Sequence, residues 1–270
     1  MSSDPFRIRA HVAEFDAIVA EIVRRSEETR ATISMAADLA YGPDPTETVD
    51  LFFPEGLRSA LPVHMFIHGG YWRMFSKRDY SYVADTVTRA GAIAVVVDYA
   101  LMPAVRMERI VDQVRRARDW VLERITDFGG DAGALTVSGH SAGAHLATML
   151  FNDDRRPSGI REALLLGGLY DLKPLQNSFL RNEIAITDEE VERFTPLGHR
   201  FDASVKVEIL VGEDETPPFH GQAAAFATNL GRQALQVSQS TVPGNHMSSV
   251  RDLGVPGTAA AAALERTIRR

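Results

Sequence analysis

Apolar residues recur along this chain in two patterns that alternate with each other. Continuous apolar runs typical of buried strands occupy residues 61–67, 92–98, 135–138, 163–166 and 207–211, and a last strand is expected at 235–242. Apolar positions at helical spacing predict helices at 79–90, 107–128 and 219 to about 230. Buried strands separated by helices are typical of a parallel sheet that is covered on both faces. The pattern therefore predicts an α/β fold with a mostly parallel central sheet.

Two segments lie outside that alternation. Between residues 11 and 30, apolar residues three and four positions apart predict an amphipathic helix, so residues 1–40 are expected to form an N-terminal helical segment. From about 170 to 203 the pattern breaks into short helical pieces and turns. An insertion there lies at the carboxyl edge of the sheet, where ligands bind. We expect one domain over residues 1–270, with 170–203 as a small helical cap insertion over the pocket.

Composition excludes several classes of protein. The net charge of −7 argues against nucleic acid as a partner, and no apolar run reaches the roughly 18 residues that a membrane span requires. The chain has no cysteine, which excludes disulfides, a thiol nucleophile and thiolate metal sites. Since it also lacks an H-E-x-x-H motif, we expect no metal and no cofactor. The first residues do not read as a secretory signal, which favours a cytoplasmic protein acting on a small molecule; a homodimer stays open.

The most informative turn is Gly139-His140-Ser141-Ala142-Gly143. It follows the strand at 135–138 and precedes an Ala/Leu-rich helix, which is the context of a nucleophile elbow. The pentapeptide alone arises by chance in roughly one chain in ten of this length, so the flanking strand and helix carry the interpretation. In such an elbow the serine adopts a strained backbone conformation, and its hydroxyl is exposed above the sheet. Ser141 is the predicted nucleophile.

A second glycine-rich turn, His68-Gly69-Gly70-Tyr71-Trp72, ends the strand at 61–67. Two successive glycines allow the backbone to turn its N–H groups away from the sheet and toward a ligand. In α/β-hydrolases the loop after this strand supplies oxyanion-hole donors, which complement the N–H that follows the nucleophile. We therefore expect the N–H groups of Gly70, Tyr71 and Ala142 to form an oxyanion hole.

A serine nucleophile needs a base, and the base needs a carboxylate that orients it. In α/β-hydrolases these follow the serine in the order acid, then histidine. The histidines after Ser141 are His145, His199, His220 and His246. Only His246 lies in a loop directly after the last strand, where the base belongs. The acid follows the strand at 207–211, where Glu213, Asp214 and Glu215 are adjacent, and spacing alone does not choose among them.

Further motifs lie on both sides of these turns. They are Tyr41-Gly42-Pro43, Asp50-Leu51-Phe52-Phe53-Pro54, Ala144-His145-Leu146, Tyr170-Asp171-Leu172 with Pro174, Gly212-Glu213 with Pro217, Phe219 and Gln222, and Asn245-His246. With these motifs and the His-Gly-Gly-Tyr-Trp turn, the chain from Tyr41 to its C-terminus resembles the kynurenine formamidase (arylformamidase) family of α/β-hydrolases. This family is related to the hormone-sensitive-lipase-type esterases, which carry His-Gly-Gly-Gly at that turn. The resemblance implies an α/β-hydrolase fold and a role in tryptophan catabolism.

The resemblance also selects among the three carboxylates. In the family's acid loop the catalytic carboxylate follows the glycine by three residues and directly precedes Ser-Pro or Thr-Pro, a position that Glu215 holds here. Glu215 is therefore the first choice for the acid and Asp214 the second. The animal and yeast enzymes carry aspartate at this position, so the glutamate departs from the family pattern.

The reaction that this family implies is the hydrolysis of an N-formyl arylamine, with N-formylkynurenine as the family substrate. Ser141 would attack the formyl carbon, and the resulting formyl-enzyme would be hydrolysed by water. Trp72, Tyr170 and Phe219 are expected to wall an aromatic substrate pocket.

Other interpretations of the same residues stay open. Arg73, Lys77 and Arg78 are candidates for binding a substrate carboxylate, and a solvated helix start is the alternative. A carboxylesterase acting on small aryl or short-acyl esters would use the same catalytic residues. A non-catalytic ligand-binding protein on a hydrolase fold would not need Ser141, His246 and the Gly-Gly turn together.

Overall fold

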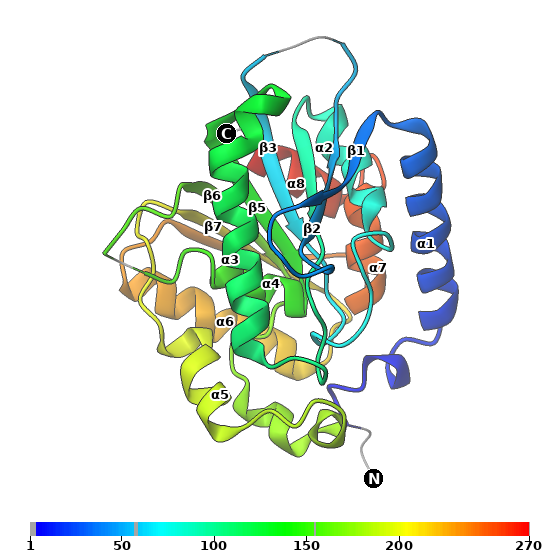
Figure 1. Cartoon of the computed structure of the whole chain (residues 1–270). Helices are drawn as coiled ribbons and strands as arrows, with labels where there is room; N and C mark the ends of the chain where they lie inside the picture. The colour runs from blue at the N-terminus through cyan, green and yellow to red at the C-terminus, as the bar shows by residue number, and fades with distance from the viewer. Residues whose placement is uncertain (1–3, 57–58, 154, 270) are drawn as a thin grey trace.

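The computed structural model describes residues 4–56, 59–153 and 155–269, and a mixed β-sheet lies at its centre (Figure 1). Within these residues the sheet has eight strands in the order β1-β2-β4-β3-β5-β6-β7-β8. Their bounds are β1 Met35–Ala40, β2 Thr48–Phe52, β3 Leu61–Ile67, β4 Ile93–Val97, β5 Gly130–His140, β6 Ile160–Leu166, β7 Lys206–Gly212 and β8 Val237–Val242. From β4 to β8 all neighbours are parallel, whereas β2 is antiparallel to both β1 and β4.

Helices cover both faces of the sheet (Figure 1). Helices α3, α4 and α6 pack on one face, and α1, α2, α7 and α8 lie on the other. Their bounds are α1 Phe15–Thr32, α2 Ala84–Arg89, α3 Met107–Arg124, α4 Ala142–Thr148, α6 Pro217–Arg232, α7 His246–Arg251 and α8 Ala259–Arg269. Every residue of β4 is buried, as expected for a β-branched run covered on both sides. The predicted α/β-hydrolase fold is confirmed.

Between β6 and β7 the chain forms only short helices, within the segment predicted as a cap insertion. They are η4 Lys173–Asn177, η5 Phe179–Asn182, α5 Asp188–Phe194 and η6 Pro196–Gly198. Helix α5 begins with a capping box, in which Thr187 and Glu190 satisfy each other's backbone N–H groups. Glu190 also pairs with Arg106, which immediately precedes α3. In Figure 1, α5 and the N-terminal segment lie at the same end of the sheet.

Two local predictions differ from the structure. Residues 35–40, expected within a helical segment, form the edge strand β1. Their sequence has no regular alternation, and the pairing of β1 with β2 is interrupted around Asp38, which has a φ of +55°. His246, expected in a loop, is the first residue of α7, because the Asn245 side chain accepts hydrogen bonds from the N–H groups of Met247 and Ser248 and starts a helix there.

Candidate active site

Ser141 lies in a sharp turn between β5 and α4. Its backbone has φ +55° and ψ −119°, a conformation that non-glycine residues rarely adopt. The strand next to it stabilises this geometry, because the Ser141 N–H donates to the carbonyl of Leu166 over 2.9 Å. Both flanking glycines are required, since a Cβ at Gly143 would overlap the carbonyl oxygen of Ile67 and one at Gly139 would overlap the backbone of Gly143.

His246 and Glu215 form a buried hydrogen-bonded pair. The Nδ1 atom of His246 lies 2.8 Å from Oε1 and 3.0 Å from Oε2 of Glu215, and the glutamate side chain is fully buried. A carboxylate only accepts, so Nδ1 carries the proton and the lone pair of the neutral ring is on Nε2. Glu213 and Asp214 are exposed. Of the three adjacent carboxylates, Glu215 is the one that contacts the histidine.

The loop after β3 adopts an unusual backbone conformation. Three successive residues have positive φ, +105° at Gly70, +50° at Tyr71 and +57° at Trp72. Gly70 cannot be replaced easily, because a Cβ there would overlap the carbonyl oxygen of Met74. Within the described part of the chain, no acceptor is found for the N–H of Gly70 or Tyr71. Ala142 is the first residue of α4, so its N–H has no partner inside that helix.

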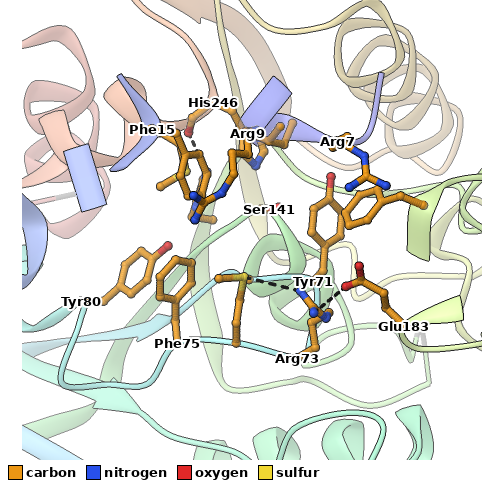
Figure 2. Close-up of a pocket in the computed structure, with 16 residues that line it drawn as sticks. Arg7, Arg9, Phe15, Tyr71, Arg73, Phe75, Tyr80, Ser141, Glu183 and His246 are labelled. Carbon is orange, nitrogen blue, oxygen red and sulfur yellow. Dashed lines mark hydrogen bonds and ion pairs between the residues drawn. The ribbon is translucent and has the colours of Figure 1, made fainter. Parts of the chain in front are cut away.

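Ser141 and His246 line the same cavity, which has a volume of about 240 Å³ (Figure 2). Its walls come from the loop after β3, the N-terminal segment and η5. The other lining residues are Arg7, Ile8, Arg9, Phe15, Gly70, Tyr71, Arg73, Met74, Phe75, Tyr80, His140, Phe179, Glu183 and Met247. Figure 2 shows Phe15, Phe75 and Tyr80 on one side of the cavity, and Arg7, Tyr71 and Glu183 on the other. The cavity thus has an aromatic side and a more polar side.

The prediction that Trp72, Tyr170 and Phe219 wall the pocket is wrong, because all three are buried behind it. The Trp72 Nε1–H donates to Nδ1 of His145 over 3.2 Å. The ring of Tyr170 stacks on Phe226, with centroids 4.3 Å apart. The ring of Phe219 packs against the ring of His246, with centroids 4.6 Å apart. These aromatic residues support the site from the core and do not face a ligand.

The basic residues after β3 are also distributed differently from the expectation. Lys77 is buried between Asp38 and Asp50, which both accept from its Nζ, so it belongs to a structural ion cluster. Arg78 is exposed beside Asp38. Of the three candidates only Arg73 lines the cavity, and it is paired with a carboxylate, Glu183, at 2.5 Å.

Sequence reasoning missed the contribution of the N-terminal segment. Arg7, Ile8, Arg9 and Phe15 line the cavity, although the sequence predicts only a helical segment here and no part of the site. No local motif marks these residues, because their position depends on contacts with distant parts of the chain. The sequence Arg7-Ile8-Arg9, with two basic residues around an apolar one directly before the predicted helix, is the local feature that could have indicated them.

His140, which precedes Ser141, contributes a neutral buried ring. Its Nε2–H donates to the carbonyl of His246 over 3.0 Å, and the centroids of the His140 and His246 rings lie 4.5 Å apart. Burial, reinforced by the nearby His246, lowers the pKa of His140 well below its usual value. His140 is therefore neutral at neutral pH, and of these two rings it is that of His246 that contacts a carboxylate, that of Glu215. The described residues contain no group of histidines and carboxylates able to hold a metal ion.

A model of the alpha/beta hydrolase fold family matches residues 64–245. Kynurenine formamidase from Danio rerio is 30% identical over 265 residues, which cover 94% of this chain and 86% of that protein. This chain is a kynurenine formamidase-like alpha/beta hydrolase. The predicted family is therefore confirmed.

Other relatives of this alpha/beta hydrolase have different names. Esterase LipQ from Mycobacterium tuberculosis is 26% identical over 243 residues, covering 80% of this chain and 58% of that protein. The solved structure of a putative thioesterase from Silicibacter sp. TM1040 superposes with a TM-score of 0.85 at 23% identity, covering 99% of this chain and 98% of that one. That structural likeness shows the shared fold. Among the helices described, none is long and apolar enough to cross a membrane.

Proposed function

We propose that this hydrolase cleaves N-formyl arylamines such as N-formylkynurenine, with Ser141 as nucleophile, His246 as base and Glu215 as the orienting acid. The observation that carries the proposal is the buried His246–Glu215 pair, whose histidine lines the same cavity as the strained Ser141. Such a pair gives the imidazole the tautomer that accepts a proton from a serine hydroxyl. The Danio rerio relative is called a kynurenine formamidase, which favours a formamide as substrate.

In the first step, Nε2 of His246 takes the proton of the Ser141 hydroxyl while Oγ attacks the formyl carbon. The carbonyl oxygen becomes an oxyanion, and the N–H groups of Gly70, Tyr71 and Ala142 donate to it. One such donor contributes about 10²–10³ in turnover. Glu215 stabilises the imidazolium that forms.

In the second step, the C–N bond breaks and the aryl amine leaves with the proton from His246. An aryl nitrogen leaves more readily than an alkyl nitrogen, so a site of esterase type is adequate for this amide. Water then attacks the formyl-enzyme and gives its proton to Nε2, and the bond to Oγ breaks. Formic acid departs, and the proton returns to Ser141.

The size and lining of the cavity fit this substrate class. A formyl group is the smallest acyl group, and the cavity that contains Ser141 is only about 240 Å³. Phe15, Phe75 and Tyr80 provide apolar surface for an aryl ring on one side of it (Figure 2). The cytoplasmic location and the homodimer stay predictions of the sequence.

A carboxylesterase for small aryl or short-acyl esters is the second candidate, which the similarity to Esterase LipQ favours. The deciding experiment measures kcat/KM for N-formylkynurenine and for 4-nitrophenyl acetate with the same preparation. We expect the formamide to be cleaved with the higher kcat/KM. Cleavage of the ester alone would replace the formamidase proposal by the esterase one.

A further inference from the structure

Residues 4–14, which precede α1, form a strap across the cavity, and three hydrogen bonds anchor it to three different parts of the site. They are Tyr71 Oη–H to the Phe6 carbonyl at 2.5 Å, Thr216 Oγ1–H to the Pro5 carbonyl at 2.8 Å, and Phe179 N–H to the Asp4 carboxylate at 2.5 Å. The anchors therefore lie in the loop after β3, beside the acid Glu215 and on η5. Two of the three anchors, Tyr71 and Thr216, belong to segments that carry the proposed chemistry.

The strap fixes the position of Arg7. Its neighbours Phe6 and Ile8 are buried, while the Arg7 side chain is exposed and lines the cavity. The guanidinium carbon lies 4.6 Å from the ring centroid of Phe179, so the planar group is stacked on an aromatic ring. In Figure 2, Arg7 lies beside Tyr71, across the cavity from Phe15, Phe75 and Tyr80. A substrate whose ring packs on the aromatic side would direct its other end toward Arg7.

Arg7 differs from the other two arginines of the cavity in its partners. Arg73 is paired with Glu183 at 2.5 Å, and Arg9 is paired with Asp16 at 2.7 Å. For Arg7, no carboxylate among residues 4–56, 59–153 and 155–269 lies within ion-pairing distance. The cavity therefore contains one guanidinium whose charge no described carboxylate neutralises.

We propose that Arg7 binds the carboxylate of the substrate, and that it thereby sets a preference for N-formyl arylamines whose side chain ends in a carboxylate. The inference rests on the proposed function and deepens it. A guanidinium presents paired N–H donors that match the two oxygens of a carboxylate, and stacking on Phe179 limits its orientation in advance. Arg7 is a specificity-determining residue in this account, because it contacts a part of the substrate remote from the formyl group.

The test is Arg7→Ala, assayed with N-formylkynurenine and with its side-chain carboxamide, which keeps the ammonium group and lacks the negative charge. We expect kcat/KM for the carboxylate substrate to fall about tenfold, mostly through KM, because one exposed charged contact is lost. For the carboxamide we expect a change below about twofold. Arg7→Lys keeps the positive charge but lacks the paired N–H donors of a guanidinium, so it should retain part of the preference for the carboxylate substrate over the carboxamide. High salt should reduce that preference in the unsubstituted enzyme.

Arg24→Ala is the matched control, since Arg24 is an exposed arginine of α1 that pairs with Glu28 and does not line the cavity. It should leave both substrates unchanged. An equal loss on both substrates with Arg7→Ala would mean that Arg7 only holds the strap. An unchanged kcat/KM for the carboxylate substrate with Arg7→Ala would also overturn the proposal. So would a fall in kcat/KM confined to the carboxylate substrate that appears with Arg9→Ala and not with Arg7→Ala.

A failure of the proposed function is distinguishable from a failure of the Arg7 assignment. If the unsubstituted enzyme cleaves neither formamide but does cleave 4-nitrophenyl acetate, the formamidase proposal fails. Arg7→Ala is then assayed with 3-(4-acetoxyphenyl)propionate and its carboxamide. A loss confined to the carboxylate ester upholds the role of Arg7, and equal rates on both esters reject it.

Discussion

The floor and the roof of the cavity differ in how their polar groups are held. The floor consists of the turns that carry Ser141, Glu215 and His246, and all three residues are buried and fixed by nearby backbone. The roof consists of the strap, η5 and the ion pair between Arg73 of the loop after β3 and Glu183, which follows η5. This pair is partly exposed, with 32% of the Arg73 side chain and 33% of the Glu183 side chain accessible. Reactions require fixed geometry, whereas recognition of a remote charge does not. Floor substitutions should therefore change kcat, and roof substitutions should change mainly KM.

The largest effect expected is that of Ser141→Ala. Removal of the proposed nucleophile should lower kcat for N-formylkynurenine by about 10⁴–10⁶. The strained turn remains, so the free energy of unfolding should stay within about 1 kcal/mol of the unsubstituted value. Single-turnover assays and denaturant unfolding measure the two quantities. If the variant kept more than about one part in a hundred of the activity, Ser141 would not be the nucleophile.

Glu215→Gln should have the next largest effect. The amide keeps the shape of the side chain but removes the charge that stabilises the imidazolium, and kcat should fall by about 10²–10⁴. Asp214→Asn is the matched control, because Asp214 is adjacent, exposed and without contact to His246. We expect kcat of the control to be unchanged. A larger fall in kcat for Asp214→Asn than for Glu215→Gln would identify Asp214 as the acid.

Acid should destabilise the protein through histidines buried beneath the floor. Burial lowers the pKa of His64 to about 3 and that of His145 to about 4. In the unfolded chain these rings take up protons below about pH 6.5, whereas in the folded protein they stay neutral until the pH approaches their lower pKa. The contribution of these histidines to the free energy of unfolding is therefore fully present above about pH 6.5 and is lost as the pH falls toward the folded pKa. Each of the two histidines should lower the free energy of unfolding by about 2 kcal/mol between pH 7.5 and pH 5.

Guanidinium chloride unfolding at the two pH values measures this loss. The variant His145→Gln should lose about 2 kcal/mol less than the unsubstituted chain between pH 7.5 and pH 5. An unchanged pH dependence would mean that His145 is protonated in the folded protein.

The smallest effect should come from the roof. Glu183→Gln removes the partner of Arg73 and leaves a second guanidinium in the cavity without a carboxylate. KM for carboxylate substrates should fall about two- to threefold with kcat unchanged, because a partly exposed ion pair contributes at most about 1 kcal/mol. Steady-state kinetics on N-formylkynurenine and its carboxamide provide the measurement. A large drop in kcat would show that the roof takes part in the floor's geometry.

The division between floor and roof also separates what could be predicted from sequence. The turns at Ser141 and Gly70 were predictable, because their geometry depends on glycines and on flanking strands that are local in the chain. Glu215 was selected over Asp214 only through the family resemblance, since adjacent carboxylates differ in burial and not in local pattern. The start of a helix at His246 depended on the side chain of Asn245 acting as its cap.

The roof could not be predicted in the same way. The strap's anchors join residues that are 65 to 211 positions apart, so no local window contains them. Trp72, Tyr170 and Phe219 were expected to face the ligand because they are aromatic and near the motifs. Large apolar side chains next to a site are as well suited to support it from the core, and sequence alone does not distinguish the two positions.

The central claim is that His246 activates Ser141, and reaction with an aryl phosphonate tests it most directly. We predict one adduct per chain, located by mass spectrometry on the peptide that contains Ser141, and a rate of labelling that falls by at least about 10² in His246→Gln. Labelling at another residue, or labelling of Ser141 at the same rate without His246, would contradict the account.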